Sequence, residues 1–216
     1  MTTTLDVLLL ESQSRAGDAA SAALEAAGHR VHRCFDEPSY GFPCRGVLDA
    51  RQCPIERPID VALLVRRRVA PRPTPYEGGV RCAIRAGVPI VEHGADLYDP
   101  FAPWITSRIE STAEVVPGCV GAAQQALAPL GRAITDRIRA LLDAAEIDPA
   151  AVHQTIDTNG LSMVVHLHLP APVSRSLKQA LAVRVLDAVR SHDRTLGSID
   201  VAVHVPTETG GACGLE

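Results

Sequence analysis

The chain has 216 residues, enough for one large domain or two small ones that each bury a hydrophobic core. Hydrophobic residues make up 46% and charged residues 21%, a composition typical of soluble globular proteins. A formal net charge of -4 and an aromatic content of 3% argue against nucleic-acid binding and against attachment to a membrane surface.

The N-terminus carries an apolar run, residues 5–10, that is far too short for a signal peptide or a membrane span. We therefore expect a cytoplasmic protein with no membrane insertion. In that compartment the six cysteines should be reduced thiols, metal ligands or redox-active groups rather than structural disulfides.

The first half alternates apolar strands with alanine-rich helices. Strands are predicted at residues 6–11, 30–35, 59–65, 88–93 and, more weakly, 113–116, with helices at 14–28, 78–87 and 118–128. Between the second and third strands, a Cys-rich loop over residues 34–58 stands where a helix is expected. The alternation predicts an α/β fold with a doubly wound, flavodoxin-like parallel sheet and helices on both faces.

The second half has a different order of elements. An amphipathic helix at 130–144 precedes strands at 151–157 and 161–169, which an Asn-Gly turn joins into a hairpin. A helix at 173–191 and a strand at 198–205 follow. We expect a receiver-like domain over residues 1–129, a small αββαβ domain over 130–207 and a flexible tail over 208–216.

The stretches "VLLLESQSRAGDAASAALEAAGHRV" and "PIDVALLV" resemble the receiver domain of bacterial response regulators, over residues 5–128. The resemblance implies a regulatory fold, but its chemistry does not carry over. Ser12 and Gln13 follow Glu11 where a receiver has acidic residues for Mg²⁺, and Val65 and Arg66 stand where the phosphoacceptor aspartate should be. We therefore expect a degenerate pseudo-receiver without aspartyl-phosphate chemistry.

The stretch "SMVVHLHLPAPVSRSLKQALAVRVLDAVRSHDRTLGSIDVAVHVP" is similar to the cytosolic C-terminal domain of cation-efflux transporters. The similarity covers residues 131–206 and implies a unit that forms homodimers. It does not imply transport, because the transporter's membrane helices have no counterpart in this sequence.

Four cysteines form the first candidate site. Thiolates bind zinc and iron–sulfur clusters, and the expected fold could bring these residues to one edge of the sheet: Cys34, Cys44, Cys53 and Cys82. An iron–sulfur cluster or a zinc ion is expected, and the Cys53–Pro54 pair also suits thiolate ligation of haem. The alternative is that these cysteines are incidental; Cys119 is assigned to a helix core and Cys213 to the tail.

Four histidines form the second candidate site. Strand alternation places them on the helix-free face of the second sheet: His153, His166, His168 and His204. They could bind a second metal ion or form an interface, and the alternative is an ordinary polar face.

Three arginines at the end of the third strand, Arg66, Arg67 and Arg68, form a weaker anion-binding candidate. No Gly-rich phosphate loop accompanies them, and a solvated rim is the alternative.

Three hypotheses of function follow. The first is a non-catalytic regulatory or adaptor protein that senses redox state or metal through the four cysteines and acts on a protein partner. The second is an enzyme or a nucleotide-binding protein that uses the arginine edge together with Glu11 and His93. The third is a metal-free interaction scaffold.

Overall fold

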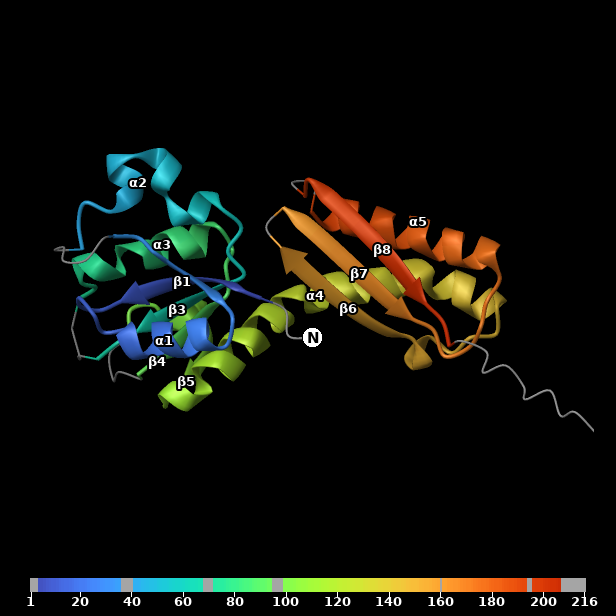
Figure 1. Ribbon diagram of the computed structural model, residues 1–216, viewed down its shortest axis with the longest axis horizontal. Helices are drawn as coiled ribbons and strands as arrows, with labels where there is room; N and C mark the ends of the chain where they lie inside the picture. The colour runs from blue at the N-terminus through green and yellow to red at the C-terminus, as the bar shows by residue number, and fades with distance from the viewer. Residues whose placement is uncertain are drawn as a thin grey trace, which may run out of the picture. The chain divides into compact units, whose positions relative to one another are not determined.

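The computed structural model describes residues 4–35, 41–67, 72–94, 99–159, 161–193 and 196–206. The chain forms two compact units, Met1–Ala126 and Leu127–Glu216, and each has its own sheet (Figure 1). In the described part of the chain, no helix is both long enough and apolar enough to cross a membrane.

The first unit is built on a parallel five-stranded sheet in the order β2-β1-β3-β4-β5. Its strands are β1 (Asp6–Glu11), β2 (Arg30–Arg33), β3 (Val61–Val65), β4 (Ile90–His93) and β5 (Ile105–Ile109). This is the flavodoxin-like strand order, which receiver domains share. The predicted fold class is therefore confirmed.

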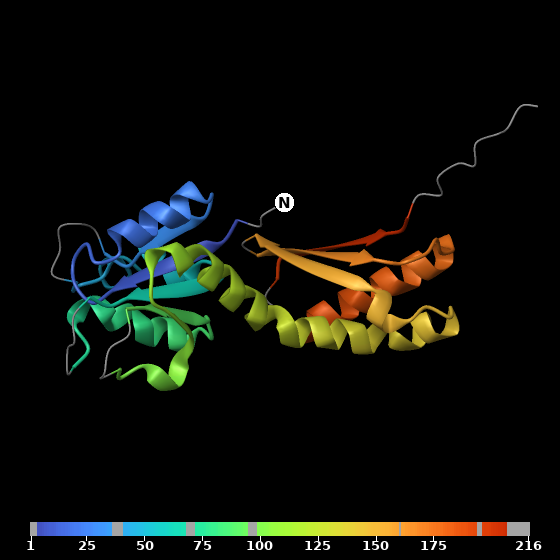
Figure 2. The same cartoon turned by 90° about the horizontal axis from the view of Figure 1, so that it is seen from below.

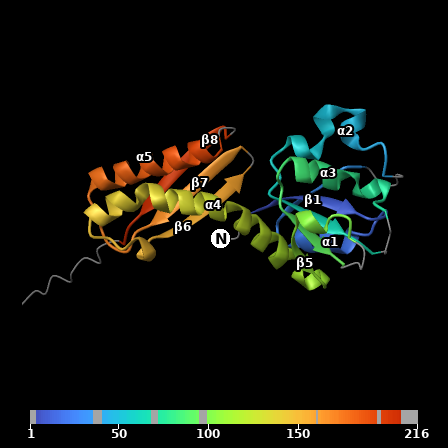
Figure 3. The same cartoon turned by 180° about the vertical axis from the view of Figure 1, so that it is seen from behind.

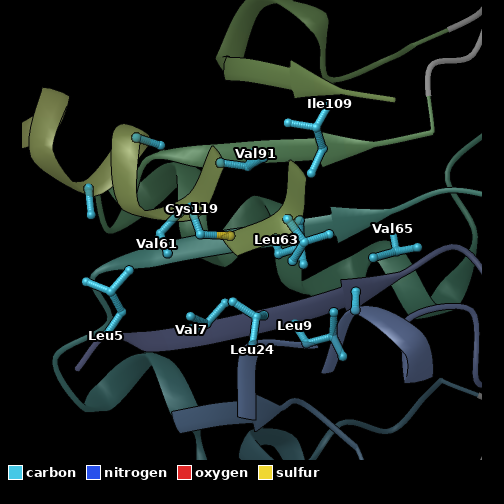
Figure 4. Close-up of a cluster of buried hydrophobic side chains, with 14 of the residues drawn as sticks. Leu5, Val7, Leu9, Leu24, Val61, Leu63, Val65, Val91, Ile109 and Cys119 are labelled. Carbon is cyan, nitrogen blue, oxygen red and sulfur yellow. The ribbon is translucent and has the colours of Figure 1, made fainter. Parts of the chain in front are cut away.

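Both faces of this sheet are buried, which explains the unbroken apolar runs in the sequence. Val7 and Leu9 of β1 face a core shared with α1 (Asp18–Ala26) and the first turns of α4 (Val115–Ala144), as Figure 4 shows. Leu8 and Leu10 point to the other face, where α3 (Gly78–Arg85) covers them.

The prediction of a fifth strand at residues 113–116 is wrong. Ser111 and Glu114 form a capping box that starts a helical turn at Thr112–Glu114, and α4 begins at Val115. The fifth strand is the preceding segment, Ile105–Ile109, where half-buried and exposed residues alternate up to the buried Ile109, as in an edge strand.

The prediction of two separate helices at 118–128 and 130–144 is also wrong. A single helix of 30 residues, α4, covers both segments and contains Pro129. Proline removes one helical hydrogen bond and crowds the carbonyl of the preceding turn, yet the helix and its apolar period continue past it through Leu130, Ile134 and Ile138, all of which are buried.

The second unit continues from α4 with β6 (His153–Asn159), β7 (Ser162–His168), α5 (Arg175–His192) and β8 (Ser198–His204). β7 is the central strand, antiparallel to β6 and parallel to β8. The predicted αββαβ order is confirmed. Figures 2 and 3 show α5 and the later turns of α4 on one face of this sheet. Gly160 of the predicted turn and the predicted tail, 208–216, lie outside the described residues.

Candidate functional site

Cys34 is the buried centre of the cysteine group. It directly follows β2, is 8% exposed, and packs in the core on the α3 side of the sheet. Its carbonyl oxygen accepts a hydrogen bond of 2.7 Å from the backbone N–H of Arg45. This bond holds Cys44, the residue before Arg45, next to Cys34.

Two glycines allow the other cysteines to approach. A Cβ on Gly46 would lie 2.9 Å from the sulfur of Cys53, so Cys53 packs directly on the short helix that follows Cys44. A Cβ on Gly79 would lie 3.0 Å from the sulfur of Cys34, which places α3 against Cys34. Cys82 lies one turn further along the same helix. The four thiols therefore gather on one side of the sheet.

The electrostatics of Cys34 reflect this grouping. Burial is the main cause that raises the pKa of its thiol, to about 12, and the neighbouring thiols of Cys44, Cys53 and Cys82 raise the pKa further, while Arg45 opposes them. Cys34 is thus a neutral thiol at physiological pH unless a cation replaces the proton.

The thiols are grouped more loosely than the ligands of one bound ion. Across the described ranges, no three His, Cys, Asp or Glu side chains are placed so that they could hold a metal ion as they stand. Four thiolates on a single zinc ion, at Zn–S distances of about 2.3 Å, would lie about 3.8 Å apart. Metal binding here therefore requires the thiols to move closer together or to hold a centre larger than one ion.

The segment that carries Cys44 and Cys53, residues 41–58, is here called the thiol segment. It folds into α2 (Arg45–Leu48) and two 3-10 turns, Ala50–Gln52 and Pro54–Glu56, rather than an irregular loop. Six large hydrophobic side chains are exposed in the described part of the chain, and three of them are here: Phe42, Val47 and Leu48. Exposed apolar groups gathered on one short segment are typical of a protein-docking surface.

Arg66, predicted as an anion ligand, lies inside an ion-pair network. Its side chain is 1% exposed, and its Nε donates to Glu77 at 2.8 Å, while Glu92 and Asp99 lie 3.6 Å from its Nη1. Arg108 contacts the same Glu92 at 2.8 Å. Because carboxylates of the protein surround it, Arg66 is not available to an external anion.

The two neighbouring arginines differ from Arg66. Arg67 is exposed, and its backbone N–H donates to the hydroxyl of Ser12 at 3.2 Å. Arg68 lies outside the described residues. The three predicted anion ligands therefore do not converge in the described part of the chain.

The buried carboxylates at this edge of the sheet are paired as well. Glu11 is fully buried and accepts hydrogen bonds of 2.7 Å from the backbone of Gly17 and from Arg33. Burial raises the pKa of Glu92, while the hydrogen bond from Arg108 opposes that change. His93 ends β4 and is half-buried. Sequence reasoning missed most of this network, although Glu92, a charge within the apolar strand "IVEH", signals a buried partner.

The four histidines lie on the open face of the second sheet, and their rings form a chain of contacts. Nδ1 of His166 is 2.9 Å from Nε2 of His204, and Nε2 of His166 is 3.4 Å from a carboxylate oxygen of Asp157. The ring of His168 stacks on that of His204 with centroids 4.6 Å apart, and His153 follows at 6.2 Å from His168. Partial desolvation, and then the other three imidazoles, lower the pKa of His168.

The comparisons with known proteins add little to this description. No family model matches the sequence, and no curated protein matches it. Among solved structures, the chain is similar to the N-terminal domain of a response regulator receiver protein from Methanoculleus marisnigri JR1. The identity is 18%, the match covers 52% of this chain and 90% of that one, and the TM-score is 0.32.

A variant of Aquifex aeolicus Era bound to GDP and AlF4- is similar at 11% identity, with 96% of this chain and 95% of that one covered and a TM-score of 0.33. Such low scores carry no argument about function. The class of the first unit rests on its strand order. The likeness of the second unit to the domain of cation-efflux transporters rests on sequence and element order alone.

Proposed function

We propose that the protein is a non-catalytic regulatory or adaptor protein in which a thiolate-bound metal centre controls a docking segment. The ligands are Cys34, Cys44, Cys53 and Cys82, and the docking surface is the thiol segment with its exposed apolar side chains. The observation that carries the proposal is that Cys44 and Cys53 lie on the segment that exposes three large hydrophobic side chains, and that this segment is hydrogen-bonded to Cys34.

Four thiolates suit either an iron–sulfur cluster or a zinc ion. A cluster contains several iron atoms, so its four cysteine ligands lie farther apart than those of a single ion. The Cys53–Pro54 pair favours an iron–sulfur cluster over zinc, since cluster ligands are often followed by proline. A cluster would make the segment responsive to oxidants, whereas zinc would make it responsive to metal supply.

The thiol segment is attached to the core at a few points. α2 buries none of its residues, but the backbone N–H of Arg45 donates to Cys34, Cys44 and Ile55 pack against the core, and Pro54 is buried. Gly41, at the start of the segment, packs against Tyr76: a Cβ there would lie 2.8 Å from the backbone nitrogen of Tyr76. Loss of the metal would thus release Phe42, Val47 and Leu48 from their fixed arrangement, and a partner that recognises them would dissociate.

The test is anaerobic purification of the full chain, followed by a visible spectrum and assays for iron, zinc and sulfide. We expect iron with sulfide and broad visible absorbance; zinc alone would identify the other metal. Cys44→Ser and Cys53→Ser should each lose the metal, whereas the matched control Cys213→Ser, in the C-terminal tail, should keep it.

Hydrogen–deuterium exchange then tests whether the bound metal orders the thiol segment. Removal of the metal with a chelator should raise amide exchange in residues 41–58 and leave β3 unchanged. Two results together would contradict the proposal and favour the metal-free scaffold. The purified wild-type protein would contain no metal, and its Cys44→Ser and Cys53→Ser variants would show the same amide exchange as the wild type.

A further inference from the structure

Two thiols of the proposed centre lie in positions that also suit a covalent bond between them. The backbone N–H of Arg45 donates to the carbonyl oxygen of Cys34 at 2.7 Å, and Cys44 is the residue before Arg45. We propose that Cys34 and Cys44 form a disulfide bond when the centre holds no metal. The inference rests on the proposed function for its regulatory role, because the bond would use two of the four proposed ligands, whereas the bond itself needs only the two thiols.

The backbone hydrogen bond limits the distance between these two cysteines. Its oxygen lies about 2.4 Å from Cα of Cys34, and its nitrogen lies about 2.4 Å from Cα of Cys44. A peptide N–H points roughly at right angles to the line that joins its nitrogen to the preceding Cα. With 2.7 Å between nitrogen and oxygen, the two Cα atoms are therefore at most about 7 Å apart. Most disulfides join residues whose Cα atoms lie about 4.4–6.8 Å apart, so the backbone is close enough for the bond.

The two side chains also share one core. Cys34 is buried in the core on the α3 side of the sheet, and Cys44 packs against that same core. Among the other thiols, Cys44 has the largest effect on the pKa of Cys34. Cys53 is placed differently, because its sulfur lies 2.9 Å from the Cβ position of Gly46. Cys44 is therefore the partner that the backbone and the core favour for Cys34.

The oxidant is a small-molecule disulfide such as oxidised glutathione. Cys44 is half-buried and more accessible than Cys34, so its thiolate attacks first, bonds to one glutathione sulfur and releases the other glutathione as a thiol. The thiolate of Cys34 then attacks the sulfur of Cys44 and displaces the second glutathione. The protein loses two thiol protons and two electrons, and one glutathione disulfide becomes two glutathione thiols. Because the pKa of Cys34 is raised to about 12, the second step is the slower one.

The bond would lock the thiol segment in its metal-free form. It would remove two ligands, so metal could not return until the disulfide is reduced. It would also tie Cys44, the N-cap of α2, to the residue that follows β2. The metal-free protein would then have two states, a reduced state with a loosened thiol segment and an oxidised state in which the start of the segment is held on the core.

The test uses the full chain, reduced, freed of metal with a chelator and then incubated with oxidised glutathione. Alkylation of the remaining thiols and digestion with trypsin follow. Trypsin cleaves after Arg33 and Arg45, so Cys34 and Cys44 lie in one peptide, residues 34–45. We expect this peptide to resist alkylation and to lose the mass of two hydrogen atoms. In Cys34→Ser only the first step remains, so the peptide should instead gain one glutathione on Cys44.

Cys53→Ser is the matched control and should form the same bond as the wild type, with circular dichroism showing that each variant is folded. Amide exchange in residues 41–58 should be slower in the oxidised metal-free protein than in the reduced one. An alkylated peptide 34–45, or a bond from Cys34 to Cys53 that joins two peptides, would overturn the inference even in a protein that binds metal. The bond found in a protein that purifies without metal would support it and contradict only the proposed function.

Discussion

Ionisable side chains have opposite environments in the two sheets of this protein. The first sheet is covered on both faces, and each of its buried carboxylates has an arginine partner: Asp6 pairs with Arg30, Glu11 with Arg33, and Glu92 with Arg108. Within the described part of the second unit, α4 and α5 cover one face of the second sheet (Figure 2). Its open face gathers four imidazoles that contact one another.

The difference follows from desolvation. A charge buried between a sheet and its helices is costly unless an opposite charge accompanies it, so each buried carboxylate in the described strands of the first sheet is paired with an arginine. On an open face water solvates each group, and like groups can gather at little cost. The imidazoles on this face hydrogen-bond and stack with one another, whereas the buried carboxylates of the first sheet are paired with arginines.

The largest expected effect is at Arg66, where the need for paired charges in the first unit can be tested. Arg66→Ala would leave Glu77, Glu92 and Asp99 buried around an absent cation, so we expect a loss of about 3–5 kcal/mol in the free energy of unfolding. Urea unfolding of the full chain measures it. Arg67→Ala is the matched control, because that residue is exposed, and it should change the free energy of unfolding by less than about 0.5 kcal/mol. Equal effects of the two substitutions would show that the network is not needed.

The two faces of β7 should differ nearly as much. Leu167 is fully buried, so Leu167→Ala should lower the free energy of unfolding of the second unit by about 2–5 kcal/mol. The adjacent residue on the open face offers the control: with a chelator present, His166→Ala should cost less than about 0.5 kcal/mol. If His166→Ala were as destabilising as Leu167→Ala without metal, the open face would be part of the fold rather than a free surface.

Asp6 allows the pairing in the first sheet to be tested by pH. The hydrogen bond from Arg30 lowers the pKa of Asp6, with His32 adding to the effect against the opposing effect of burial. A lowered pKa in the folded state means that the ionised form stabilises the fold, and that this stabilisation is present above the unfolded pKa of about 3.9 and is lost as the pH falls below it. Asp6→Asn should cost about 1–3 kcal/mol at neutral pH.

Unfolding curves at a series of pH values measure this difference between Asp6→Asn and the wild type. The gap should shrink as the pH falls below about 4, because the wild-type carboxyl then becomes neutral too. A gap of the same size at pH 3 and pH 7 would mean that the side chain acts through its shape and not its charge.

Much of the fold could be predicted from sequence, because burial on both faces produces long apolar runs such as those of β1 and β3. The predicted strand positions were wrong where the secondary-structure preference of a residue disagreed with its surroundings in the fold. Val115 and Val116 have the branched side chains of a strand, but the capping box at Ser111 places them in a helix. β5 is an edge strand with polar residues, so its apolar signal is weak.

In the candidate sites too, local sequence patterns were predictable and contacts that depend on tertiary packing were not. Strand alternation was sufficient to place the four histidines on one face, since that pattern is local. The approach of Cys82 to Cys34 was not predictable with certainty, because it depends on where α3 packs. The partners of Arg66 were also missed, since Glu77 and Asp99 come from segments with no pattern that connects them to β3.

The ion pairs at the end of the parallel sheet have a consequence for evolution. Val65, the last residue of β3, is 3% exposed and stands beside Glu11 and His93 in the sheet. An aspartate introduced there by a single mutation would enter an edge whose arginines are already paired with carboxylates, so it would add an uncompensated negative charge. An aspartate at this position would therefore need compensating changes among the neighbouring carboxylates.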